Sequence, residues 1–122
     1  MDQVSDATFD ELVTRSAKPV LVDFWAPWCT NCKRLAPLVD ELADAHGQTW
    51  SVLTLNIEEN PASAVRLKVL SLPTVMTFVD GAEVERLSGA LSKAKLVELM
   101  QRTRPFADAG RRPPTTPAAT SG

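Results

Sequence analysis

The sequence lacks several features that mark membrane, secreted or metal-bound proteins. No apolar run approaches the roughly 18 residues of a membrane-spanning helix, so we expect no membrane span. The first residues are acidic, whereas a secretory signal is basic and then apolar, so we expect a cytoplasmic protein. The chain has two cysteines and one histidine, His46, too few for the four ligands of a structural zinc site within one molecule.

An excess of charge of either sign is also missing. The 122 residues include 13 Lys and Arg against 15 Asp and Glu, a formal net charge of −2, which gives no basic surface for nucleic-acid binding. Apolar residues make up 44% of the chain and charged residues 23%, as in ordinary globular proteins. The length is sufficient for one domain with a sizeable core and too short for two domains of ordinary size.

The composition changes at Arg104. Residues 104–122 contain four of the nine prolines and almost no large apolar side chain. Such a segment cannot bury enough apolar surface to offset the entropy lost on ordering. We therefore predict a domain over residues 1–103 and a disordered, proline-rich tail over residues 104–122.

Helix and strand patterns alternate along the predicted domain. Strands are expected at residues 1–4, 19–25, 50–57, 73–80 and 82–88, and helices at 8–16, 30–46, 60–67 and from 92 onward. The local signals are capping residues at Thr8, Asn60 and Ser92, a left-handed cap at Gly47 and a hairpin turn at Asp80-Gly81. This order predicts an α/β fold, a mixed sheet of four to five strands flanked by four helices.

Both cysteines lie in the segment WAPWCTNCK, residues 25–33, between a predicted buried strand and a predicted helix. Unpaired N–H groups and the positive end of the helix dipole stabilise negative charge there, which favours the thiolate form of Cys29. We interpret Cys29 as a nucleophile and Cys32, one turn further on, as the resolving thiol. Two alternatives stay open: a pair of core thiols, or a metal site shared with a second chain.

Four separated segments resemble the thioredoxin family in sequence and in order: VDFWAPWCTNCK, NIEENP, SLPTVMTF and DGAEVERLSGALSK. The resemblance covers about residues 1–103. It implies the thioredoxin fold and a protein-disulfide reductase with a redox-active Cys29–Cys32 disulfide and no bound cofactor. It also implies a monomer that acts on protein disulfides and is itself reduced by thioredoxin reductase, an NADPH-dependent flavoenzyme.

The resemblance assigns further residues. Asp23 matches the family's buried aspartate, which implies that it exchanges a proton with Cys32. The implied substrate surface consists of Trp28, Leu72, Pro73 and Gly89, with a cis peptide bond before Pro73. The positions implied to be structural, or to tune the thiols, include Trp25, Lys33 and Pro37.

Some positions depart from the family pattern. Thr30 and Asn31 stand between the cysteines, where thioredoxins typically have Gly and Pro, and this dipeptide controls the potential of the couple. Thr54 replaces a lysine near the buried aspartate, and Leu70 replaces a residue that is often charged. Two alternatives to a reductase therefore remain: an oxidant or isomerase with a less reducing couple, and a redox-inert adaptor that uses the same fold.

Overall fold

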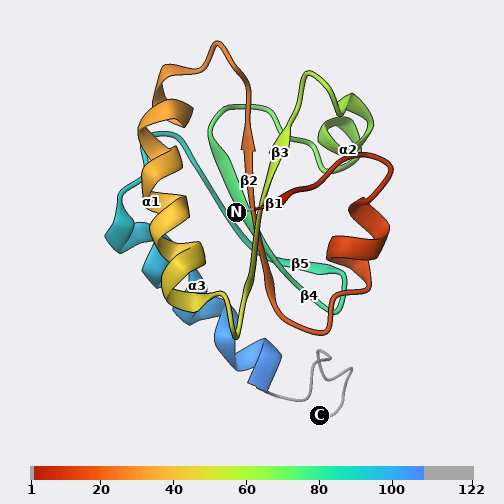
Figure 1. The fold of residues 1–122 in the computed structure, drawn as a ribbon, viewed down its shortest axis with the longest axis vertical. Helices are drawn as coiled ribbons and strands as arrows, with labels where there is room; N and C mark the ends of the chain where they lie inside the picture. The colour runs from red at the N-terminus through yellow and green to blue at the C-terminus, as the bar shows by residue number, and fades with distance from the viewer. Residues whose placement is uncertain (1, 109–122) are drawn as a thin grey trace.

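The computed structural model describes residues 2–108, which form one five-stranded mixed sheet with helical elements on both faces (Figure 1). The strands are β1 (Asp2–Gln3), β2 (Val20–Trp25), β3 (Ser51–Asn56), β4 (Thr74–Val79) and β5 (Ala82–Ser88). They are arranged in the order β1-β3-β2-β4-β5. Strands β1, β3 and β2 run parallel to one another. Strand β4 is antiparallel to β2, and β5 is antiparallel to β4. The predicted α/β class and mixed sheet are confirmed.

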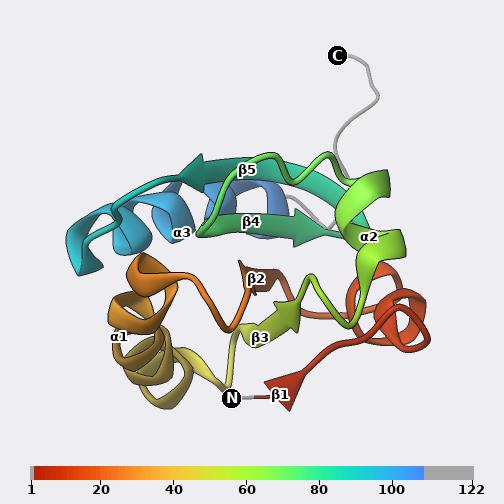
Figure 2. The same cartoon turned by 90° about the horizontal axis from the view of Figure 1, so that it is seen from above.

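The helical elements cover the sheet in two layers (Figure 2). Helices α1 (Thr30–His46) and α3 (Lys93–Asp108) lie on one face, and α2 (Pro61–Arg66) and a short π-helix, η1 (Asp10–Thr14), lie on the other. A separate apolar cluster fills each interface. Both faces of the sheet are therefore buried, as is usual where helices cover parallel strands.

The central strand β2 determines where the Asp23 carboxyl group lies. Val22 and Phe24 belong to the cluster on the α2 face, and Leu21 belongs to the cluster on the α1 face. Successive side chains of a strand point to opposite faces, so Asp23 shares its face with Leu21. The strand therefore directs a carboxylate beneath α1.

Two predicted caps are wrong for local reasons, and a third is only partly confirmed. Thr8 does not cap a helix, because its hydroxyl accepts a hydrogen bond from the Ser5 N–H (2.9 Å), and the following turn is π-helical. Gly47 is right-handed (φ −62°), since the N–H of Trp50 bonds to the His46 carbonyl and closes the helix end without a left-handed residue. Asn60 is the N-cap residue of α2 and Pro61 follows at the start of the helix, as predicted, but the Asn60 side chain makes no cap hydrogen bond.

The side chain of Asp6, rather than that of Asn60, bonds the free N–H groups at the start of α2. Its carboxylate accepts hydrogen bonds from the N–H groups of Ala62 (3.2 Å) and Ser63 (2.8 Å). The Asn60 side chain instead accepts from the N–H of Asp6 (2.8 Å) and donates to the Asn56 carbonyl (3.1 Å). We call Asp6, Asn60, Ala62 and Ser63 the cap network.

Two other local predictions are confirmed. Asp80 (φ 52°) and Gly81 (φ 82°) both adopt the left-handed conformation of a two-residue hairpin turn. The Ser92 hydroxyl accepts a hydrogen bond from the N–H of Lys95 (3.3 Å) at the start of α3. In both cases the residues that form the feature are neighbours in the sequence.

The predicted start of the tail at Arg104 is too early, because α3 continues to Asp108. Thr103 is buried and hydrogen-bonded to Thr77 of β4 (2.6 Å), which anchors the helix shortly before its end. Arg104 and Asp108 form an ion pair across one further turn (3.7 Å). Pro105 lies in the last turn of α3, where its missing N–H leaves the carbonyl of Gln101 without the usual helical donor. Residues 109–122 of the predicted tail lie outside the described part of the chain.

Candidate active site at the start of helix α1

The candidate site lies at the end of the sheet where β2 finishes and β4 begins (Figure 1). Phe24, near the end of β2, pairs with Thr74, the first residue of β4. The antiparallel pairing therefore brings the loop that carries Cys29 to the same end of the sheet as the loop that carries Pro73. Cys29 is the N-cap residue of α1 and has an extended backbone (φ −90°, ψ 109°).

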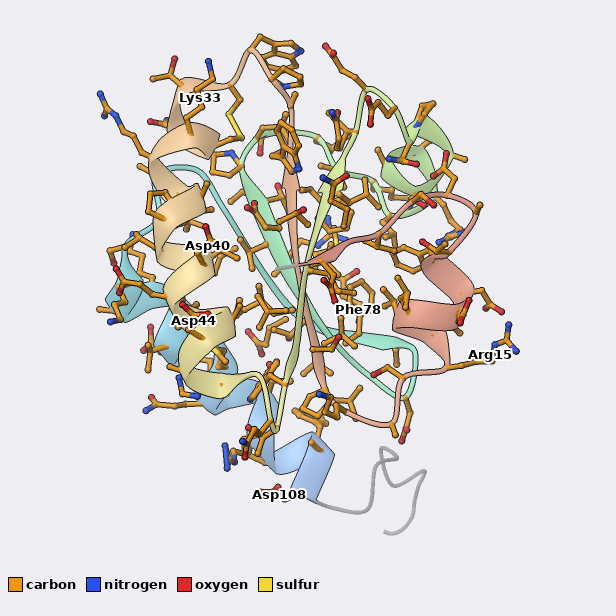
Figure 3. All side chains as sticks on the ribbon, in the orientation of Figure 1. Arg15, Lys33, Asp40, Asp44, Phe78 and Asp108 are labelled. Carbon is orange, nitrogen blue, oxygen red and sulfur yellow. A yellow bond between two sulfur atoms is a disulfide. The ribbon has the colours of Figure 1, made fainter. Side chains whose placement is uncertain are left out.

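The two cysteines form a disulfide with a Cα–Cα distance of 5.2 Å. Figure 3 shows this bond in yellow, close to the labelled Lys33 on the first turns of α1. The backbone N–H of Cys32 donates a hydrogen bond to Cys29 Sγ (3.1 Å). The same N–H would stabilise negative charge on that sulfur in the reduced protein. Cys29 is 7% exposed and Cys32 3%, so Cys29 is the more accessible sulfur-bearing residue.

A cavity of about 210 Å³ lies beneath the disulfide. We call it the thiol cavity, and its lining residues are Asp23, Trp25, Cys32, Lys33, Ala36 and Thr54. A cavity of this size has room for water. The structure therefore brings the predicted aspartate and the predicted resolving cysteine to the lining of one partly open cavity.

Asp23 is the one charged residue of β2, the strand that contributes to both apolar clusters. It is only 2% exposed. Within residues 2–108 its Oδ1 atom has no hydrogen-bond partner. Burial disfavours the charged carboxylate and raises the pKa of Asp23 to about 7. Near neutral pH this carboxyl group can therefore both accept and release a proton.

Thr54 occupies the β3 position that pairs with Asp23. Its side chain is short and uncharged, so it provides no positive charge to stabilise the carboxylate. Trp25 is half-buried at the end of β2, and Lys33 is exposed on α1 at the edge of the cavity. The structure thus places the predicted tuning residues Trp25, Lys33 and Thr54 around the same cavity.

The residues of the predicted substrate surface lie in loops at the same end of the sheet as the disulfide. Trp28 is 64% exposed, and its indole N–H donates a hydrogen bond to the Glu58 carboxylate. The Leu72–Pro73 peptide bond is cis, as predicted. The N–H of Gly89 donates to the Pro73 carbonyl (3.0 Å), and Gly89 has a left-handed backbone (φ +94°) that favours glycine. A Cβ atom at Gly89 would meet no other atom within 4 Å, so this side of the surface is open.

Three further predicted residues lie on α1. Thr30 and Asn31 are exposed on its first turn, between the two cysteines, and Pro37 lies inside the helix. Glu58 was not singled out from the sequence, although it lies within the NIEENP segment. Its contact with Trp28 joins residues that are 30 positions apart, so no local pattern indicates it.

Residues 2–108 contain neither a cluster of metal-binding side chains nor a membrane-spanning helix. No three His, Cys, Asp or Glu side chains are grouped so that they could hold a metal ion. None of the described helices combines the length and apolar character that crossing a membrane requires.

A disulfide at the N-terminus of a helix, beside a buried carboxyl group and a cis-proline loop on a mixed sheet, defines a thiol–disulfide oxidoreductase. Comparison with known proteins gives the family. The Thioredoxin family model matches residues 1–102, and the chain belongs to the thioredoxin family. It is a protein-disulfide reductase whose redox group is the Cys29–Cys32 disulfide.

Curated relatives agree over most of the chain. Thioredoxin 1 of Synechococcus elongatus is 43% identical over 99 residues, which cover 81% of this chain and 92% of the relative. Thioredoxin of Rhodospirillum rubrum is 45% identical over 101 residues, 83% of this chain and 97% of the relative. The chloroplastic M-type thioredoxin of Pisum sativum is 42% identical over 99 residues, 81% of this chain and 58% of the relative.

Proposed function

We propose that Cys29 attacks the disulfide of a partner protein, Cys32 resolves the resulting mixed disulfide, and Asp23 accepts the proton of Cys32. The observation that carries this assignment is the thiol cavity, which holds the buried Asp23 carboxyl group and Cys32 together. Asp23 has no competing hydrogen-bond partner on Oδ1 within the described residues, so this oxygen is free to receive a proton directly or through water.

In the first step the Cys29 thiolate attacks one sulfur of the substrate disulfide. The substrate S–S bond breaks, a Cys29–substrate disulfide forms, and the other substrate sulfur leaves as a thiolate that takes a proton from water. The helix N-terminus and the Cys32 N–H favour this step because they stabilise the attacking thiolate.

In the second step Cys32 attacks the Cys29 sulfur of the mixed disulfide. Asp23 takes the proton of the Cys32 thiol, the Cys29–Cys32 disulfide forms, and the second substrate thiolate is released. The net result is the transfer of two electrons from the protein dithiol to the substrate. The structure with the Cys29–Cys32 bond corresponds to the oxidised product.

The substrate chain pairs as an added strand with the backbone at Leu72 and Pro73. Trp28 and Gly89 border this edge, one as an exposed apolar side chain and the other as an open position. Leu70, which is 92% exposed on the same connection, adds an apolar contact for residues that flank the substrate cysteine. This surface suits an extended peptide with apolar side chains.

The oxidised protein needs an external source of two electrons. We propose thioredoxin reductase, the NADPH-dependent flavoenzyme, in that role, because the family membership supports it. The protein itself works as a monomer without a bound cofactor. We place it in the cytoplasm, a reducing compartment in which a closely spaced cysteine pair cycles rather than remaining oxidised.

Replacement of one cysteine at a time tests the two roles. In Cys32→Ser the first step still occurs and the second cannot, so the variant should accumulate as a mixed disulfide with a disulfide-bonded protein substrate. The matched variant Cys29→Ser should accumulate none, because its remaining thiol is the less accessible one. Non-reducing electrophoresis measures both. Equal trapping by the two variants would contradict the assignment.

A second measurement decides the direction of the reaction. Equilibration with thiol buffers of graded potential gives the reduction potential of the Cys29–Cys32 couple. A value of about −270 mV, as in thioredoxin, supports the proposal that the protein is a general reductant despite Thr30 and Asn31. A value near about −180 mV, that of protein disulfide isomerase, would instead favour the oxidant or isomerase alternative.

A further inference from the structure

Arg86 on β5 makes an unusually complete set of contacts for a surface residue. Its guanidinium forms a two-point ion pair with Glu83, Nε to Oε2 at 2.6 Å and Nη2 to Oε1 at 2.8 Å. The same group donates to two backbone carbonyls beyond the end of α2, those of Leu67 (Nη2, 2.8 Å) and Lys68 (Nη1, 3.1 Å). Glu83 thus fixes the plane of the guanidinium, and the remaining N–H groups hold the backbone.

The backbone that Arg86 holds has a conformation that its sequence disfavours. Lys68 is left-handed (φ 57°), a region that glycine enters readily and a lysine does not. The two carbonyls that Arg86 contacts belong to Lys68 and to the residue before it. The last turn of α2 is already closed by backbone hydrogen bonds, from Leu67 N–H to the Ser63 carbonyl and from Lys68 N–H to the Val65 carbonyl. Arg86 therefore adds donors for the two carbonyls that follow the helix, and these tertiary hydrogen bonds hold the left-handed turn in place.

This turn directs the connection that forms the substrate edge. Residues 67–73 lead from α2 to β4 and include Leu72 and the cis Pro73. Arg86 pairs with Met76 of β4, so its contacts fix the turn relative to the strand into which the connection runs. We propose that Arg86 is a positioning residue that holds residues 67–73 in the conformation that binds an extended peptide substrate.

This inference rests on the proposed function, since it assumes that substrates pair with the Leu72–Pro73 edge. Arg86 itself does not line the thiol cavity. Its loss should therefore weaken the binding of peptide substrates and leave the thiol chemistry unchanged. A lysine at this position would replace it poorly, because an ammonium group lacks the planar fork that reaches Glu83 and both carbonyls together.

The test compares two substrates with the full-length protein, using dithiothreitol as the electron source. One substrate is a disulfide-bonded peptide with several residues on each side of its cystine, and the other is hydroxyethyl disulfide, which has no peptide backbone. In Arg86→Gln we expect KM for the peptide to rise about fivefold with kcat within about twofold. The rate with hydroxyethyl disulfide and the potential of the Cys29–Cys32 couple should stay at the wild-type values.

The matched control is Arg102→Gln. Arg102 is another half-exposed arginine with acidic partners, Glu98 at 3.4 Å and Glu85 at 4.0 Å, but it contacts no residue of the 67–73 connection in the described structure. Its KM for the peptide should be that of the wild type. A suppressor sharpens the test: Lys68→Gly relieves the left-handed turn, so it should restore most of the lost peptide affinity to Arg86→Gln.

The double variant also serves if Arg86→Gln alone does not fold. In that case the inference predicts that Lys68→Gly with Arg86→Gln folds and reduces the peptide with nearly the wild-type KM. An unchanged KM in folded Arg86→Gln would overturn the inference while leaving the proposed function intact. An equal loss with hydroxyethyl disulfide, or no rescue by Lys68→Gly, would also overturn it. Failure of the wild type to reduce the peptide would instead contradict the proposed function.

Discussion

The cap network and the thiol cavity use the same side chain in opposite ways. In the cap network, the Asp6 carboxylate accepts two backbone hydrogen bonds, and hydrogen bonding to Ser63 holds its pKa below the ordinary value. In the thiol cavity, Asp23 is buried without a partner for Oδ1 among the described residues, and burial raises its pKa to about 7. The first carboxylate stays charged over the neutral range, and the second titrates within it.

This difference shows how the fold separates stability from reactivity. A carboxylate that is hydrogen-bonded at a helix N-terminus stabilises the folded state. A buried carboxyl group with an unpaired oxygen is costly when charged, and in the proposed mechanism this cost keeps Asp23 ready to exchange a proton. Because Asp6 is hydrogen-bonded and Oδ1 of Asp23 is not, among the described residues, substitutions in the cap network and in the thiol cavity should differ in the pH dependence of stability and in their effect on turnover.

The largest expected effect is the pH dependence of stability in the thiol cavity. The pKa of Asp23 is about 7 in the folded protein and 3.8 in the unfolded reference. Between these values the folded state holds a proton that the unfolded state has lost, so stability falls as pH rises from about 4 to about 7. The loss should reach about 4 kcal/mol above pH 7.

Urea unfolding of the oxidised protein between pH 3 and pH 9 measures this loss. The isosteric Asp23→Asn cannot ionise, so its free energy of unfolding should lack this component and should exceed that of the wild type most clearly above pH 7. Curves of the two proteins that run parallel over the whole range would show that Asp23 does not titrate upon unfolding as described.

The second effect concerns turnover. Asp23→Asn removes the proton acceptor for Cys32, so the mixed disulfide should be resolved more slowly at pH 7, by about 10-fold to 100-fold. Rapid quenching with acid and separation of the mixed disulfide measure its lifetime. The first step, measured in the Cys32→Ser background, should not change with Asp23→Asn. A slower first step would mean that Asp23 acts on Cys29 instead.

A third experiment changes the charge beside Asp23. Thr54→Lys places a cation opposite the carboxyl group on β3 and should lower the pKa of Asp23 by about one to three units. The fall in stability with pH should still begin near pH 4, but it should end at a pH lower by the same amount, and the total loss should be correspondingly smaller. Thr54→Met, which has an uncharged chain of similar length, is the control and should not lower it. Equal shifts in both variants would indicate altered packing rather than charge.

The same two regions show what the sequence could and could not predict. Apolar residues on both sides of Asp23 indicated its burial, and the helix signal after Cys29 placed the disulfide at a helix start. The cis bond before Pro73 followed from the family resemblance. The cap network was missed because Asp6 reaches its partner Ser63 across 57 positions, and this tertiary contact replaced the local cap expected at Asn60.

Local signals succeeded at two turns and failed at Thr8 and Gly47, where neighbouring residues formed a different hydrogen bond from the one expected. Asp80-Gly81 and Ser92 use only sequence neighbours, and the structure confirms both. The contact of Glu58 with Trp28 and those of Arg86 with the carbonyls after α2 depend on how β5 and the loops pack, so periodicity and spacing did not indicate them.

The smallest expected effect lies in the cap network. Asn60→Ala removes hydrogen bonds to the Asp6 N–H and to the Asn56 carbonyl, so it should lower the free energy of unfolding by about 1–2 kcal/mol. The loss should be nearly the same at every pH between 5 and 9, because an amide does not titrate, and turnover should stay at the wild-type value. Gln101→Ala, at an exposed position of α3, is the control and should change stability little. A pH-dependent loss in Asn60→Ala, or a slower resolution of the mixed disulfide, would mean that the cap network and the thiol cavity are coupled and that the fold does not separate stability from reactivity.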